Sequence, residues 1–231
     1  MSLTASSLKL PEFVDANGLP IPTEVFISKE RMEGVILPRI GDEIARFLYK
    51  HQSQKCLLVS TKEGADYSFN WILDKYFDER RYSLTNAERT YIWPRGGGTL
   101  GEERVTLKED CPIDWAGRVV LNFEFLCHHG FTVEYINNIK NKNVSPSQRP
   151  AELKFIYVLE KFGEDVARGK PPCYGNVAET IQTPLYLAGC GLDWKDSKSD
   201  QPRLRNLPCV IAVPRDSIYT GNLDGFYQET A

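Results

Sequence analysis

Short apolar runs alternate with amphipathic segments between about residues 38 and 160. The apolar runs have the length and side chains of buried strands, and they lie at 56–60, 89–93, 118–124 and 154–159. The amphipathic segments predict a helix that begins near Pro38, a second with Phe69 to Phe77 on one face, and a third carrying Thr132 and Ile136. This alternation predicts an α/β fold, with a parallel-sheet core flanked by helices.

The helical period disappears from about residue 165, where short strand-like runs, prolines and turn residues replace it. We therefore expect a single domain, 1–231, with a core at about 36–164 and a small hood lobe formed by 1–35 and 165–231. Pro94 and the glycines that follow it predict a loop after the second strand. In open parallel sheets, ligands bind at the carboxyl ends of the strands.

Composition excludes some partners and compartments. The 231 residues carry a formal charge of −3, which argues against a basic nucleic-acid surface. No apolar run approaches the roughly 20 residues of a membrane span, and the first residues lack the pattern of a signal peptide. We expect a cytoplasmic protein with no membrane partner. The six cysteines include no C-x-x-C pair, so buried thiols are expected.

A strand–turn–helix junction at 119–132 offers phosphate-binding chemistry. The strand ends at Glu124, and Gly130, Phe131 and Thr132 open the next helix. Backbone amides at a helix start bind phosphate, and glycine lets the oxygens approach. Taken alone, the pattern is also that of an ordinary turn between a strand and a helix.

The tail supplies a sharper motif. Gly189-Cys190-Gly191-Leu192-Asp193-Trp194 precedes Arg205-Asn206-Leu207 and a strand. Together with the junction at 119–132, it resembles the hypoxanthine-guanine phosphoribosyltransferase family, whose tail reads Gly-Tyr-Gly-Leu-Asp-Tyr. The resemblance covers roughly residues 23–213. In chain length and in its altered phosphoribosyl motif, this chain is most similar to divergent protozoan guanine phosphoribosyltransferases.

The resemblance implies a type I phosphoribosyltransferase fold and an enzyme of purine salvage. The expected reaction transfers the phosphoribosyl group of phosphoribosyl pyrophosphate to N9 of a 6-oxopurine, guanine being the expected base. The products would be GMP and pyrophosphate. Magnesium is the implied cofactor, and a homodimer is the implied assembly.

The resemblance also assigns the sugar-donor residues. Pyrophosphate would meet Lys62, Glu63, Gly64 and Arg205, and Arg203 is a competitor for the role of Arg205. The 5′-phosphate would meet the segment formed by His129, Gly130, Phe131 and Thr132. Glu124 would bind the ribose hydroxyls, and Asp193 would bind the metal.

The purine-binding residues follow in the same way. Lys161 resembles the family's ligand for the 6-oxo group, and a register error of one residue would put Glu160 there instead. Tyr186 would stack on the base, with Trp194 as a larger alternative ring. The backbone near Leu187 would bind the base edge.

Three departures separate this chain from the family pattern. Phe125 stands where the family has its second acid, and His128-His129 replace an Asp-Thr pair. The Ser-Tyr pair of the family's lid is not found. His128 could exchange a proton with purine N7 or only donate to phosphate. These changes leave open a non-catalytic nucleotide-binding regulatory protein on the same fold, or an enzyme using xanthine or a pyrimidine.

Overall fold

The computed structural model describes most of the expected core and part of the lobe. The described residues are 13–14, 17–21, 24–62, 64–95, 106–128, 130–162, 175–183, 185–192, 204, 207, 209–214 and 218–219. Within them, no helix is long and apolar enough to cross a membrane.

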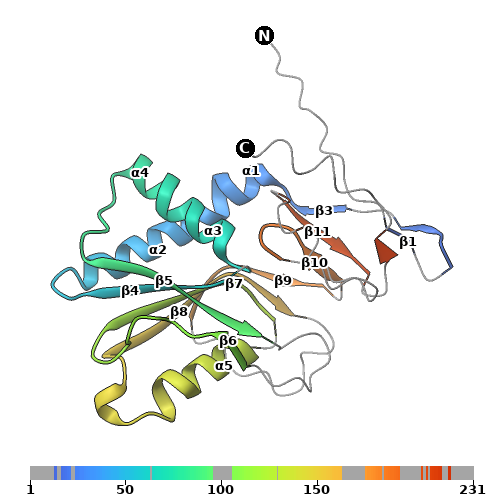
Figure 1. The fold of residues 1–231 in the computed structure, drawn as a ribbon. Coiled ribbons are helices and arrows are strands. Elements are labelled where there is room, and N and C mark those ends of the chain that lie inside the picture. The colour runs from blue at the N-terminus through green and yellow to red at the C-terminus, as the bar shows by residue number, and fades with distance from the viewer. Residues whose placement is uncertain are drawn as a thin grey trace.

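A six-stranded sheet forms the centre of the molecule (Figure 1). Its order is β6 (Thr106–Glu109), β5 (Ala87–Arg95), β4 (Cys56–Thr61), β7 (Val119–Cys127), β8 (Glu152–Phe162) and β9 (Gly175–Gln182). All neighbours are parallel except β6, which pairs antiparallel with β5. The parallel α/β core predicted from the apolar runs is confirmed.

Two boundaries differ from the prediction. The sheet includes β9, so the core does not end near residue 164; β9 mixes polar and apolar side chains, which hides it from a search for apolar runs. Strand β5 also continues through Pro94 and Arg95, where a loop was expected. The pairing of β5 with β6 shifts between Trp93 and Pro94, and such an irregularity tolerates a residue without an N–H.

The first helix begins earlier than predicted. Helix α1 (Lys29–Arg31) starts at Ser28, whose side chain accepts a hydrogen bond of 3.2 Å from the Arg31 amide. A π-helical segment, η1 (Met32–Ile36), joins it to α2 (Leu37–Lys50). Pro38 therefore lies inside a continuous helical segment. The wider π turn just before it accommodates a residue that cannot donate a backbone hydrogen bond.

Helices cover both faces of the sheet (Figure 1). One face is covered by α1, η1 and α2 together with α3 (Asp66–Asn70), η2 (Trp71–Tyr76) and α4 (Phe77–Arg80). The other is covered by α5 (Phe131–Asn137), which continues into η3 (Asn138–Lys142); η4 (Pro146–Gln148) precedes β8. Burial on both faces explains why β4 is buried at every position.

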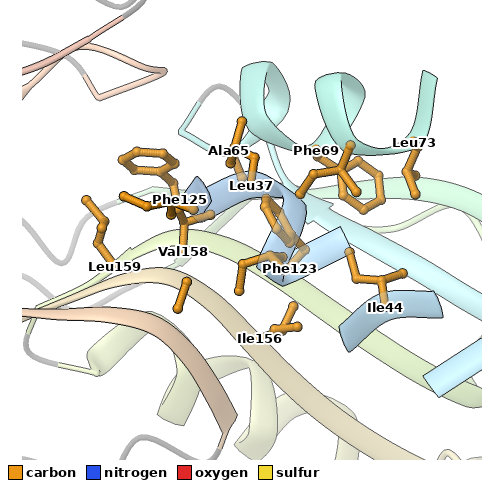
Figure 2. Close-up of a cluster of buried hydrophobic side chains, with 14 of the residues drawn as sticks. Leu37, Ile44, Ala65, Phe69, Leu73, Phe123, Phe125, Ile156, Val158 and Leu159 are labelled. Carbon is orange, nitrogen blue, oxygen red and sulfur yellow. The ribbon is translucent and has the colours of Figure 1, made fainter. Parts of the chain in front are cut away.

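Two apolar clusters lie on the two faces. Phe123 and Phe125 of β7 pack with Leu37, Phe69 and their neighbours beneath α2 and α3 (Figure 2). Val120 of the same strand belongs instead to the cluster beneath α5, with Val133 and Ile136. From Val119 to Phe125, alternate residues of β7 thus face opposite layers, which decides where Asn122 and Glu124 lie.

Two small sheets form the part of the structure beyond the carboxyl edge. One has the order β10 (Tyr186–Ala188), β11 (Val210–Val213) and β3 (Glu24–Ile27). The other joins β12 (Ile218–Tyr219), β1 (Phe13–Val14) and β2 (Pro20–Ile21). Both combine strands from the two ends of the chain, as Figure 1 shows. A third apolar cluster, containing Phe13 and Ile211, lies between them.

Candidate functional site

The strand order brings three predicted segments to one edge of the sheet. Strand β7 lies between β4 and β8, and all three run parallel. The residues that follow β4, those at the end of β7 and Lys161 near the end of β8 therefore lie at the same carboxyl edge. This edge is where an open parallel sheet binds ligands.

Glu124 lies in the middle of this edge. Its register partner on β8 is Tyr157, and Thr61 of β4 continues the row on the other side, next after the Ser60–Phe123 pair. The Oε2 atom of Glu124 is shielded from solvent and has no hydrogen-bond partner among the described residues. Burial raises the pKa of Glu124 to about 8. A carboxyl in this condition can accept hydrogen bonds from a ligand.

The predicted phosphate loop has the expected backbone. Gly130 adopts a left-handed conformation, with φ of 75°, and caps the start of α5. A residue with a Cβ would be strained there. Gly130 has no side chain that could cap the helix, and Phe131 and Thr132 follow it as the first two residues of α5. His128 is half-buried just before this loop, at the end of β7.

Lys62 follows β4, as predicted, within a tight turn. The Gly64 amide donates to the Lys62 carbonyl at 2.9 Å. The Lys62 ammonium lies 4.3 Å from the centroid of the Tyr91 ring and 4.4 Å from that of Trp93. Both rings belong to β5, so the neighbouring strand holds this cation by cation–π contact.

Lys161 is buried, with 7 % of its surface exposed, and pairs in register with Ile181 of β9. Strand β8 runs on to Phe162, so Lys161 lies within the strand rather than after it. Glu160, the alternative at this position, is half-buried. A lysine kept from solvent at the carboxyl edge of the sheet can donate a hydrogen bond to a ligand there.

Strand β10 carries Tyr186 and Leu187, two of the residues predicted to bind the base. Tyr186 is half-buried and packs against the third cluster, whereas Leu187 is buried in the main cluster. Their side chains therefore point to opposite faces. The turn that follows has three consecutive residues with positive φ: Gly189 at 97°, Cys190 at 50° and Gly191 at 98°. A Cβ on Gly189 would lie 2.0 Å from the Cys209 carbonyl oxygen, so glycine is required there.

Five predicted site residues lie outside the described residues. They are Glu63, His129, Asp193, Trp194 and Arg205, and the competitor Arg203 lies outside as well. The structure thus brings together Lys62, Glu124, the loop from Gly130 to Thr132 and Lys161 at one edge.

The sequence interpretation missed three residues of this region. Tyr91 and Trp93 contact Lys62, and Asn122 lies fully buried two residues before Glu124. Asn122 interrupts the apolar run of β7, which is a visible signal in the sequence. Phe125, at the position where the resembled family has its second acid, is buried in the main cluster and points away from the face of Glu124.

Comparison with solved structures identifies the fold. No family model matches the chain, and no curated protein matches it. The hypoxanthine phosphoribosyltransferase of Trypanosoma cruzi superposes with a TM-score of 0.62 at 19 % identity, covering 83 % of this chain and 96 % of that one. A hypoxanthine-guanine phosphoribosyltransferase from Bacillus anthracis gives a TM-score of 0.61 at 18 % identity, covering 82 % and 98 %. The chain therefore has the fold of these enzymes, the type I phosphoribosyltransferase fold.

Proposed function

We propose that this protein is a purine phosphoribosyltransferase. It transfers the phosphoribosyl group of phosphoribosyl pyrophosphate to N9 of a 6-oxopurine, guanine being the expected base, and yields GMP and pyrophosphate. The observation that carries the proposal is the end of β7, where Glu124 and the Gly130 loop occur together. A shielded carboxyl with an unpartnered oxygen and an uncapped helix start suit the ribose hydroxyls and the 5′-phosphate of one ligand.

The sugar donor would be held along the edge of β4 and β7. Its ribose hydroxyls donate to Glu124, and its 5′-phosphate accepts from the amides of Phe131 and Thr132. Lys62 and Arg205 would lie nearest the pyrophosphate. Positioning of this kind makes the attack of the base at the anomeric carbon effectively unimolecular within the complex.

The base would be held between β8 and the small sheets. Lys161 donates to the 6-oxo group, a contact that adenine cannot make with its amino group. Tyr186 or Trp194 stacks on the ring, and the backbone at Leu187 meets the base edge. These contacts select guanine or hypoxanthine over adenine.

Magnesium would need oxygen atoms of the substrate in addition to a carboxylate of this chain. Within the part of the chain that the structure describes, no three His, Cys, Asp or Glu side chains form a metal cluster. Magnesium usually takes one or two carboxylates and completes its shell with phosphate oxygens and water. Asp193 and the donor's oxygens would hold it, and when bound there it supplies charge neutralisation for the departing pyrophosphate.

His128 would manage the proton at purine N7. It stands at the end of β7 in place of the family's acid. The alternative is that it only lines the phosphate loop. Single-turnover kinetics of His128→Ala separate the two: loss of proton transfer slows the chemical step by roughly 10²-fold, whereas loss of a phosphate contact weakens donor binding.

A non-catalytic nucleotide-binding protein is the second candidate, favoured by the burial of Phe125 where the family has an acid. The deciding experiment measures GMP formation from guanine, phosphoribosyl pyrophosphate and magnesium and, separately, the binding of added GMP. Product formed over many turnovers supports the enzyme. Binding of GMP without product formation would support the regulatory alternative. A homodimer and a cytoplasmic location are further parts of the proposal.

A further inference from the structure

Asn122 is a buried amide in an apolar setting. Its exposed surface is 0 %, and neither amide atom has a hydrogen-bond partner among the described residues. Its register neighbours are Val59 on β4 and Phe155 on β8, both in the cluster beneath α5. Buried polar groups without partners are costly, and a leucine would fill the same space without that cost. A purely structural role therefore does not account for this asparagine.

Two other side chains complete a polar group on the same face. Glu124 is two residues along β7 and shares the face of Asn122. Thr61 lies beside Glu124 on β4, is 8 % exposed, and its Oγ1 also has no partner among the described residues. The three carry complementary groups: the carboxyl of Glu124 accepts, while the amide and the hydroxyl can each donate and accept.

We propose that Asn122 and Thr61 are positioning residues for Glu124, acting through one water molecule that bridges the amide, the hydroxyl and the Oε2 oxygen. A buried water needs two to four hydrogen-bonding groups around it, and these three side chains supply that number. The consequence for catalysis rests on the proposed function, in which Glu124 binds the ribose hydroxyls. The bridge fixes the carboxyl in the orientation that meets them.

The bridge also stabilises the charged form of Glu124. Burial alone raises the pKa of this carboxyl, and donors aimed at it act in the opposite direction. Helix α5, which covers this face, contributes Val133 and Ile136, and neither side chain titrates. The titratable side chains on the surrounding elements include those of Tyr157, Glu160 and Lys161 on β8, Cys127 and His128 at the end of β7, Cys111 before β7, Lys62 after β4, and Glu134 and Tyr135 on α5.

The test follows the Glu124 carboxyl by ¹³C NMR in ligand-free protein labelled at the glutamate side-chain carboxyl, with Glu124→Gln identifying the signal. Asn122→Leu and Thr61→Val should each raise the titration midpoint by about one pH unit, the size of one lost hydrogen bond to a charged group. The matched controls are Asn137→Leu and Ser68→Ala, which remove buried polar groups elsewhere. They should leave the midpoint unchanged.

Each outcome decides the proposal. A wild-type midpoint in folded Asn122→Leu and Thr61→Val overturns it, and so does an equal rise in the controls. If Asn122→Leu does not fold, Thr61→Val decides alone. Because the titration needs no substrate, it fails or succeeds independently of the proposed function. Steady-state assays of the wild type and the two variants test the consequence for catalysis, which is a raised KM for phosphoribosyl pyrophosphate in the variants. Absence of turnover in all three proteins would contradict the proposed function and leave the bridge itself untouched.

Discussion

The ammonium of Lys62 lies 4.4 Å from the centroid of the Trp93 ring and 4.3 Å from that of the Tyr91 ring. The lysine follows β4 and the ring stands on β5, so the contact exists only because these strands are parallel neighbours in register. It ties the residue assigned to pyrophosphate to the body of the sheet.

A double-mutant cycle measures the energy of this cation–π contact. Lys62→Met and Trp93→Leu, made singly and together, should show a coupling of about 1 kcal/mol in the free energy of unfolding, typical of a partly exposed cation–π contact. Urea denaturation of the four proteins gives the value. Additive effects of the two substitutions would show that the ring does not hold the cation.

The close approach of α2 and η2 predicts a sharp difference between two glycines. A Cβ on Gly41 would lie 2.4 Å from Tyr76 Cδ1, whereas one on Gly34 meets nothing within 4 Å. Gly41→Ala should therefore destabilise the protein by about 1–3 kcal/mol through overpacking. Gly34→Ala should be neutral or stabilising by up to about 1 kcal/mol, since alanine favours helix. Equal thermal-unfolding midpoints for the two variants would contradict this packing.

The turn at Gly189 predicts another contrast. Both Gly189 and Gly117 have positive φ, but only at Gly189 would a Cβ meet backbone, 2.0 Å from the Cys209 carbonyl oxygen. Gly117→Ala should cost about 1 kcal/mol from strain alone. Gly189→Ala should cost at least about 2 kcal/mol more and displace the tail that carries Asp193. The expected readout is a larger loss of stability together with weaker pyrophosphate binding, and similar behaviour of the two variants would exclude this role for the turn.

The buried carboxyl of Glu124 predicts a pH-dependent stability. Burial alone raises its folded pKa from the ordinary value of 4.5 to about 8, and the bridging donors proposed above offset only part of that rise, so the folded protein keeps a proton that the unfolded chain has already lost. The stabilisation is complete below pH 4.5 and decreases as the pH rises to about 8, with a slope of at most about 1.4 kcal/mol per pH unit. Glu124→Gln removes the titration. We measure the free energy of unfolding of both proteins between pH 5 and pH 8. That of the wild type should fall toward that of Glu124→Gln and then below it, and parallel pH dependences would refute the raised pKa.

Much of the core was predictable because parallel strands covered on both faces are apolar throughout. The runs at 56–60 and 118–124 became β4 and β7. Strand β9 was not predicted, since an edge strand such as Gly175–Gln182 keeps polar side chains among its apolar ones. The helix start was misplaced because Pro38 is a common first-turn residue, and neither the cap at Ser28 nor the π turn carries a comparably strong signal.

The candidate site was predictable where local chemistry defines it. Gly130 and Glu124 follow from a strand that ends in an acid and a helix that opens with glycine. The contacts of Lys62 with Tyr91 and Trp93 depend on the register between two strands, which no local pattern encodes. The partnerless amide of Asn122 likewise depends on the side chains that surround it in three dimensions.

The central claim is transfer of a phosphoribosyl group to a 6-oxopurine, and base discrimination tests it most directly. Initial rates of nucleotide formation are measured with phosphoribosyl pyrophosphate, magnesium and each of guanine, hypoxanthine, xanthine and adenine. We expect GMP formation with guanine, none with adenine, and a strong loss of the guanine rate in Lys161→Gln. No nucleotide from any base with folded protein, or adenine used as well as guanine, would contradict the account.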